Sequence, residues 1–293
     1  MTVPADEAGA SDRAFALLQE LLPQHLMSRT MHRLARSTQP VLRKSLIRAV
    51  LSGYPMIDLR EAAEPDPYAY PSFNAFFTRA LRADARPLAG GELDLVSPVD
   101  GTLSQLGPIR DGQLLQAKGM HYTAGALLAD DAAAARYAGG AFACIYLAPY
   151  NYHRIHMPLA GRLAATRHVP GRLFSVNAAT ARTIPGLFAR NERVVCEFET
   201  GLGPLAMVLV GALFVGSIET VFAGEINPPP ARGGVVRSID KGIGTQFARG
   251  AELGRFNMGS TVVLLLGNGA TRFADGLAPG ATLRLGQALA RTE

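Results

Sequence analysis

The sequence predicts an α+β protein in which a bundle of amphipathic N-terminal helices precedes a larger, mainly β domain. Between residues 11 and 53, apolar residues recur at helical spacing, and two prolines separate three such stretches. Further along, the chain changes to short apolar runs that are rich in β-branched residues and broken by glycine, as in strands. We expect a helical region over 1–64 and a β-rich domain over 65–293, sandwich-like or barrel-like and mainly antiparallel.

Local signals place the individual helices. Three helices are expected over residues 11–22, over 25–37 and from Pro40 to about Gly53, followed by a proline-rich loop over 54–71. Ser72 stands where a helix cap is expected, and the phenylalanines after it form one apolar face of a helix over 72–83. Within the β-rich part, only short helical inserts are expected, over 123–131 and 178–188.

One apolar stretch, residues 200–218, carries no charge and has about the length of a membrane-spanning helix. Its glycines, Pro204 and its β-branched residues favour two buried strands instead. The N-terminus lacks a basic region followed by an apolar one, so no secretory signal is expected. Cys144 and Cys196 lie in apolar runs without metal-ligand spacing, which predicts reduced core thiols in a cytoplasmic protein and no metal.

The net charge of +5 is modest, but basic residues are concentrated in the segment 25–51. This segment has six arginines and lysines, no acidic residue, and apolar residues interleaved with the charges. The pattern is typical of helices that lie on an anionic membrane surface, although ordinary surface helices packed on a core remain the alternative. Base-stacking aromatic residues are not interleaved with the charges, so we expect no nucleic-acid partner.

The segment FNMGSTVVLLL (256–266) places Gly259 and Ser260 at the start of an apolar, β-branched run. Glycine presents an unhindered carbonyl and tolerates strained backbone, so the Ser260 hydroxyl could attack the Gly259 carbonyl and shift the acyl group from nitrogen to oxygen. A plain turn that enters a strand would have the same sequence, so this tripeptide alone decides nothing.

Other motifs, in the same order along the chain, make the pattern specific. They are SFNAFFTR (72–79), SPVDG (97–101), QAKG (116–119), YHRIHMP (152–158), VPGRLFSVN (169–177), LFARNERV (187–194), VGSIETV (215–221) and GRFNMGST (254–261). Together these motifs resemble the bacterial phosphatidylserine decarboxylases, from about residue 65 to the C-terminus and more loosely through the N-terminal helices. Met258 stands where that family usually has leucine, which is a volume-conserving change.

The resemblance implies a self-processing precursor. Cleavage between Gly259 and Ser260 would give fragments 1–259 and 260–293, and Ser260 would become a covalent pyruvoyl group, the only cofactor expected. Phosphatidylserine would form a Schiff base with this group, lose carbon dioxide and leave as phosphatidylethanolamine. The resemblance also implies a peripheral enzyme on the cytoplasmic face of the cell membrane, built from two chains of one precursor and possible as a homodimer.

The resemblance further implies roles for four polar residues. His156 of YHRIHMP would be the base for self-processing, Asp100 of SPVDG would orient it, and Ser260 would complete this triad. His153 would be left for the decarboxylation step. If the strand before the motif continues through it, His153 and His156 lie on opposite faces and are not equivalent. On spacing alone, Asp100 before a glycine could equally be a turn residue.

Two other functions remain open from the sequence. A serine hydrolase could use Ser260, but this serine lacks the G-x-S-x-G elbow. A non-catalytic, membrane-surface lipid-binding β domain could use the basic helices and would leave the Gly259–Ser260 bond intact. A single gel separates these functions, because only the decarboxylase precursor yields two fragments without added protease.

Overall fold

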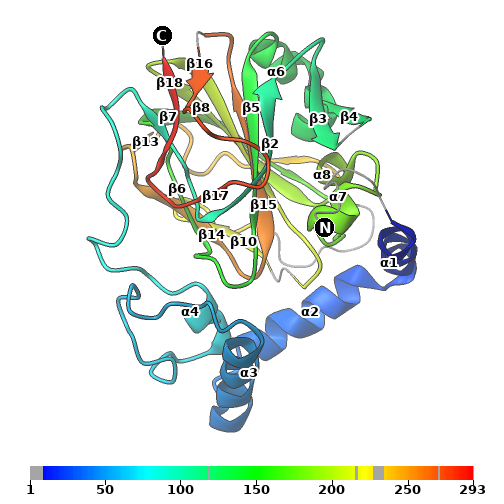
Figure 1. The fold of residues 1–293 in the computed structure, drawn as a ribbon, viewed down its shortest axis with the longest axis vertical. Helices are drawn as coiled ribbons and strands as arrows, with labels where there is room; N and C mark the ends of the chain where they lie inside the picture. The colour runs from blue at the N-terminus through cyan, green and yellow to red at the C-terminus, as the bar shows by residue number, and fades with distance from the viewer. Residues whose placement is uncertain (1–8, 118, 215–216, 227–233, 270, 293) are drawn as a thin grey trace.

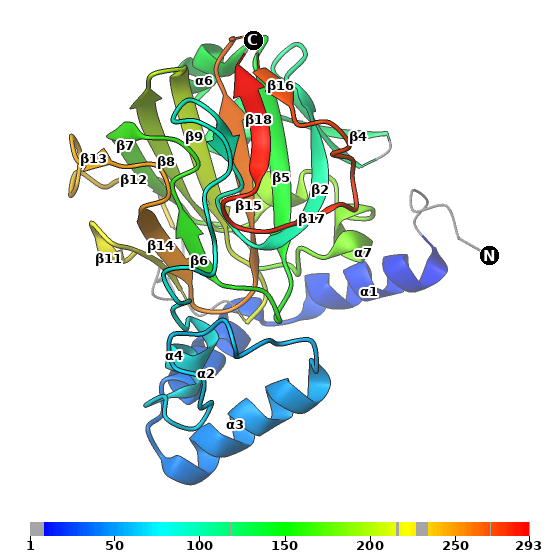
Figure 2. The same ribbon diagram turned by 60° about the vertical axis from the view of Figure 1, so that its left-hand side comes forward.

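The computed structural model describes residues 9–117, 119–214, 217–226, 234–269 and 271–292. It has an α+β fold in which helices precede a body of antiparallel sheets, as predicted. The N-terminal helices are α1 (Ala10–Leu21), α2 (Gln24–Ala35), α3 (Pro40–Gly53) and α4 (Phe73–Phe77). Figures 1 and 2 show these four helices at one end of the sheets. Lys118 and residues 215–216, which belong to two of the matched motifs, lie outside the described part.

A nine-stranded sheet forms the centre of the molecule. Its spatial order is β12 (Arg237–Ser238), β7 (Gly161–Val169), β8 (Arg193–Thr200), β9 (Gly203–Val210), β15 (Ser260–Leu266), β5 (Ala141–Leu147), β2 (Gly101–Pro108) and β17 (Thr282–Leu283), with β13 (Gln246–Phe247) paired to β7. The strand β15 is thus flanked by β5 and β9 in the middle of this sheet (Figure 2). All strand pairs among the described residues are antiparallel.

Side chains on the two faces of this sheet enter two separate cores because successive residues of a strand point to opposite sides. Along β15, Val262 and Leu264 face one core, whereas Val263 and Leu265 face the other. The first core is closed by two smaller sheets. These are β11 (Gly224–Glu225), β10 (Ile218–Thr220), β14 (Glu252–Phe256) and β6 (Arg154–His156), and β1 (Leu95–Val96), β18 (Ala288–Thr292) and β16 (Thr271–Phe273).

The second core is covered by a hairpin and short helices. These are β3 (Gln113–Ala117), β4 (Met120–Thr123), α5 (Ala124–Leu128), α6 (Asp131–Ala134), the 3₁₀ turn η1 (Ala135–Tyr137), α7 (Ala178–Ala181) and α8 (Leu187–Arg190). The insert predicted over 178–188 is two helices because Pro185 and the left-handed Gly186 interrupt it. The insert over 123–131 is divided after α5, where Ala129 adopts φ 53°.

The helix predicted over 72–83 is much shorter than expected. Ser72 caps α4 as predicted, accepting a hydrogen bond from the Ala75 main-chain nitrogen at 3.1 Å. The helix ends at Phe77 because the following chain pairs with the segment 61–63: the Ala63 nitrogen donates to Ala80 and the Arg82 nitrogen to Glu61, both at 2.9 Å. Tertiary pairing therefore overrides the helical pattern after residue 77.

The stretch 200–218 contains β9 and the start of β10, and no described helix is long and apolar enough to cross a membrane. The N-terminal helices do not form a bundle of their own. Instead α1 packs on α7 and α3 packs on α4, while α2 contacts both α3 and the β body. Several of these contacts cross the domain boundary predicted after residue 64, so the helices form a layer against the β body.

Candidate active site

Ser260 is the first residue of β15, and its position in the sheet is fixed by pairing with Leu147 of β5. The residue has no exposed surface, and its Oγ has no hydrogen-bond partner within the described part of the chain. A buried hydroxyl without a partner costs about 1–3 kcal/mol of stability, so such groups are uncommon in folded proteins. The hydroxyl is therefore available for chemistry with a neighbouring main-chain carbonyl.

The backbone directly before Ser260 is strained. Met258 adopts φ 110°, a value that L-residues rarely take and that costs on the order of 1–3 kcal/mol. Gly259 itself has no positive φ, and a Cβ there would lie an ordinary 3.6 Å from the Leu147 carbonyl oxygen. Space therefore does not demand a glycine at 259, which leaves its unhindered carbonyl as the physical reason for this residue type.

His153 lies just before β6 and is fully buried. Its Nδ1 donates to the Asn151 carbonyl oxygen at 2.8 Å, so the neutral ring carries its lone pair on Nε2, for which the described residues offer no partner. The ring centroid lies 4.1 Å from that of Phe77. Burial lowers the pKa of His153 from 6.5 to about 3; Arg79 adds to this shift and the bond to Asn151 opposes it.

His156, at the end of β6, has a different environment. Its Nδ1 donates to the Gly250 carbonyl oxygen at 2.8 Å, and its Nε2 accepts from the Tyr152 hydroxyl at 3.0 Å. Burial lowers its pKa below the ordinary value, whereas the hydrogen bond to Gly250 and the charges of Glu252 and Asp100 act in the opposite direction. The expectation that the two histidines are not equivalent agrees with these environments.

Asp100 is held by other groups than the expected histidine. Its two carboxylate oxygens accept from Arg86 Nε at 3.0 Å and Arg86 Nη2 at 2.6 Å, and Oδ1 also accepts from the Leu285 nitrogen at 2.8 Å. A planar guanidinium fork matches a carboxylate better than one imidazole nitrogen does. The structure thus brings Asp100 near His156, on which its charge acts, but forms no hydrogen bond between them.

The cleavage segment and His153 come together through shared neighbours. The main-chain nitrogen of Phe256 donates to the His153 carbonyl oxygen at 3.0 Å. Met258 packs against a cluster that includes Phe77, and the His153 ring stacks on the same phenylalanine. Neither histidine is hydrogen-bonded to Ser260, whose Oγ has no partner.

Arg79, at the end of the motif SFNAFFTR, is a residue whose individual role the sequence did not suggest. It is only 5% exposed, its Nε has no partner, and the guanidinium lies over the Phe76 ring at 5.6 Å. Burial lowers its pKa, while Tyr70, Asp100 and Tyr152 act in the opposite direction. A buried cation that no carboxylate of the described residues contacts is a candidate binding group for an anion. The sequence feature that could have indicated Arg79 is its place in the motif SFNAFFTR.

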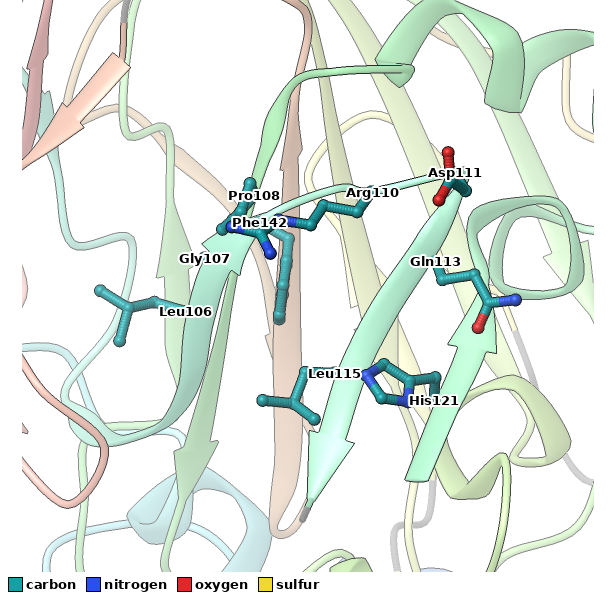
Figure 3. A pocket seen from close by; sticks show the side chains of 9 residues that line it. All are labelled: Leu106, Gly107, Pro108, Arg110, Asp111, Gln113, Leu115, His121 and Phe142. Atoms are coloured by element: carbon teal, nitrogen blue, oxygen red, sulfur yellow. The ribbon is translucent and has the colours of Figure 1, made fainter. Parts of the chain in front are cut away.

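Two cavities among the described residues do not contain these side chains. The larger, of about 420 Å³, lies between the end of β2 and the β3–β4 hairpin, where Arg110, Asp111 and His121 line it (Figure 3). The smaller, of about 220 Å³, is lined by residues that include Tyr146. Tyr146 pairs with Thr261, so these two side chains lie on one face of the sheet and the Ser260 side chain points to the opposite face. Among the described residues, no group of three or more His, Cys, Asp and Glu side chains could hold a metal.

The buried neutral His153 predicts an acid-sensitive fold. In the unfolded chain this histidine takes up a proton near pH 6.5, whereas the folded protein resists protonation down to about pH 3. Between these values the unfolded state binds more protons, so stability falls as the pH falls, by about 1.4 kcal/mol per pH unit. The test measures the free energy of unfolding by urea at pH 7 and at pH 5, in a Ser260→Ala parent and in the same protein with His153→Gln. The decrease from pH 7 to pH 5 should be smaller by roughly 2 kcal/mol in the His153→Gln variant than in the parent. Equal losses in the two proteins would contradict the buried neutral state.

Comparison with known proteins identifies the family. A family model described as phosphatidylserine decarboxylase matches residues 73–291, and a second model, described as PSD, matches residues 14–55. The chain is 51% identical over 282 residues to the phosphatidylserine decarboxylase proenzyme of Azotobacter vinelandii, covering 95% of this chain and 98% of the relative.

The proenzymes of a Shewanella species (strain ANA-3) and of Bordetella avium are 52% and 50% identical, again over 95% of this chain, and the matches cover 97% and 95% of those relatives. This similarity decides among the three functions considered from the sequence in favour of the decarboxylase. The chain belongs to the phosphatidylserine decarboxylase family, whose proenzymes form a pyruvoyl group from a serine.

Proposed function

We propose that this chain cleaves itself between Gly259 and Ser260 and then decarboxylates phosphatidylserine at the pyruvoyl group formed from Ser260. The observation that carries this assignment is the fully buried Oγ of Ser260, which has no partner among the described residues and lies two residues after the strained Met258. A hydroxyl in this position is held next to the carbonyl that it must attack, and cleavage releases the strain stored before it.

Self-cleavage needs a base and then a second proton transfer. The Ser260 Oγ loses its proton and attacks the Gly259 carbonyl carbon, the peptide C–N bond breaks, and an ester joins the two residues. Loss of the Ser260 Cα proton then releases the Gly259 carboxylate, and water replaces the nitrogen of the resulting dehydroalanine as ammonia. His156 is the proposed base because its lowered pKa keeps the ring neutral near pH 7. Asp100 supports it through its charge.

Decarboxylation uses other side chains. When formed, the pyruvoyl group supplies an electron sink for the electrons that carbon dioxide leaves behind. His153 offers a buried, neutral Nε2 that can hold or return a proton at the reacting carbon. The buried Arg79 guanidinium, whose charge acts on His153, offers a positive charge to an anionic group of the lipid.

The N-terminal helices support a peripheral membrane protein. The helix α1 buries the polar Gln19, whose Oε1 accepts from the Ser175 nitrogen at 2.7 Å, and exposes leucines instead. The exposed fractions are 68% for Leu17, 55% for Leu18 and 84% for Leu21. Exposed apolar side chains next to a basic segment are typical of helices that lie in an anionic lipid surface.

Four of the six basic residues in the segment 25–51 are exposed, namely Arg29, Arg33, Lys44 and Arg48. Arg36 is held by Glu225 of the β body instead. The free thiols of Cys144 and Cys196, both buried, agree with a reducing compartment and hence with the cytoplasmic face. A homodimer of the cleaved pair remains a prediction from the resemblance.

Self-cleavage is tested by intact-mass analysis of freshly expressed protein. Wild type should give two fragments that divide between Gly259 and Ser260, and the small fragment should have a blocked N-terminus. Ser260→Ala should stay at the full 31.1 kDa. A wild-type protein that remains uncut but still decarboxylates phosphatidylserine would refute the assignment of Ser260.

The histidine and aspartate roles predict two different defects. His156→Ala and Asp100→Asn should accumulate precursor, with cleavage slowed roughly 100-fold or more by loss of the base or of its support. His153→Ala should still cleave, at least in part, but its mature form should turn over poorly. Precursor rates and turnover per pyruvoyl group measure the two effects separately. The opposite result, with His153→Ala uncut and His156→Ala cut, would reverse the two roles.

The exposed leucines of α1 are predicted to supply much of the free energy of membrane binding. Leu17→Ser, Leu18→Ser and Leu21→Ser together should remove on the order of 3 kcal/mol of apolar transfer, which weakens liposome binding by about 100-fold or more. Sedimentation with anionic and zwitterionic vesicles at low and high salt measures this loss, and salt should weaken wild-type binding only in part. Leu93→Ser, which alters a leucine that is 57% exposed outside the helices, is the matched control. Unchanged binding of the triple variant would place lipid contact elsewhere.

A further inference from the structure

The residue two positions before Gly259 is tied to the β body by a pair of buried hydrogen bonds. The Asn257 main-chain nitrogen donates to the Ser217 carbonyl oxygen at 3.0 Å, and Asn257 Nδ2 donates to Ser217 Oγ at 2.7 Å. Asn257 is 1% exposed and Ser217 is fully buried. Because both the main chain and the side chain of Asn257 are used, its orientation is fixed.

Ser217 also connects Asn257 to the helix layer, through Glu225. Its Oγ donates to Oε1 of Glu225, and the same oxygen accepts from Arg36 Nη2 at 2.6 Å and from His32 Nε2 at 2.9 Å. Arg36 Nη2 also reaches Ser217 Oγ at 3.4 Å. Burial raises the pKa of Glu225, but the bonds from Ser217 and His32 and the Arg36 charge outweigh this and hold it below the ordinary value. The carboxylate is thus a charged link between α2 and the cleavage segment.

A second set of contacts reaches the same segment from α3 and α4. Asn74 of α4 donates from Nδ2 to Asn257 Oδ1 at 3.0 Å. Met258 packs against a buried apolar cluster in which α2 supplies Ala35, α3 supplies Ile47, and α4 supplies its phenylalanines. The two residues before Gly259 are therefore held by the helix layer together with Ser217, whereas Ser260 is held by the central sheet.

The geometry points to a positioning role for the helix layer in self-cleavage: the hydrogen-bonded chain Asn257–Ser217–Glu225–Arg36 holds Met258 in its strained conformation and so keeps the Gly259 carbonyl within reach of Ser260 Oγ. This role rests on the proposed cleavage at Gly259–Ser260. The helices that we place at the membrane then also promote the self-cleavage that activates the enzyme. Asn257, Glu225 and Arg36 are positioning residues that touch no substrate.

The test compares variants that break this chain with one that breaks a different link between helix and β body. Asn257→Ala and Arg36→Met remove two members of the chain, and Arg36→Lys restores the charge. Glu20→Ala is the matched control because Glu20 of α1 pairs with Arg190 at 2.9 Å and with Arg172 at 3.6 Å, away from Asn257. Each full-length chain is made in a cell-free system, and the first-order rate of its conversion to two fragments is followed together with its melting temperature.

Asn257→Ala and Arg36→Met should slow cleavage by about tenfold or more, the factor expected when strain of the order of 1–2 kcal/mol relaxes. Arg36→Lys should recover part of the rate, and Glu20→Ala should cleave as wild type does. Turnover per pyruvoyl group in the fraction that does mature should stay within about twofold of wild type, a split that a general loss of stability would not produce.

Hydroxylamine identifies the step that is affected, because it cleaves an ester and leaves a hydroxamate on Gly259. Variants that fail to position the attack should form the ester slowly and consume it without accumulation, so hydroxylamine should not accelerate their cleavage. Faster cleavage of these variants in hydroxylamine would overturn the positioning role, as would cleavage at the wild-type rate or equal slowing in Glu20→Ala. Failure of the wild type itself to cleave would instead contradict the proposed function, so the two failures are distinguishable.

Discussion

The pairing of β15 with both β5 and β9 is the constraint on which the candidate site depends. Ser260 is the first residue of this strand, and every residue from Ser260 to Leu266 is buried. A central strand with partners on both sides cannot shift its register without moving its apolar side chains to the wrong core. The Ser260 side chain is therefore fixed in place, and any misfit between the sheet and the preceding segment must be absorbed before it. The positive φ of Met258 is where that misfit appears.

The same constraint explains how a cleaved chain can remain one molecule. The fragment 260–293 would contribute β15 to the central sheet and β18 to a smaller one, and Val262, Leu264 and Leu289 enter a core shared with the larger fragment. Separating the small fragment would expose this apolar surface to water, which is strongly unfavourable, so the fragments should stay together after the peptide bond is cut. The strands before and after the cut belong to different sheets, since β14 pairs with β6 and β10 whereas β15 pairs with β5 and β9. The bond can therefore break without disturbing either sheet.

Sequence patterns predicted most of this architecture, and they failed where contacts between distant segments decide the outcome. The α+β class, the three long helices and the buried strands follow from local periodicity, which is a property of neighbouring residues. The length of α4 does not, because its end depends on pairing between residues 61–63 and 80–82. Likewise, motifs indicated Asp100 and His156 as partners, but Arg86 lies 14 residues before Asp100 in a segment with no motif, and only the fold shows that it holds the carboxylate.

The short helix α4 links the helix layer to the chemistry through two of its side chains. Its Phe77 stacks on His153, and its Asn74 holds Asn257, so one turn and a half of helix contacts both the proposed decarboxylation residue and the cleavage segment. Had the helix continued to residue 83, Thr78 would be a helical residue and its carbonyl would be directed along the helix rather than to Arg154 Nε, which donates to it at 2.9 Å. Arg154 in turn pairs with Glu252 at 2.8 Å, across the same β6–β14 pairing that carries His156. The early end of α4 therefore leaves the Thr78 carbonyl available to Arg154 of β6, next to the contacts that Asn74 and Phe77 make with Asn257 and His153, which local helix propensity alone would not achieve.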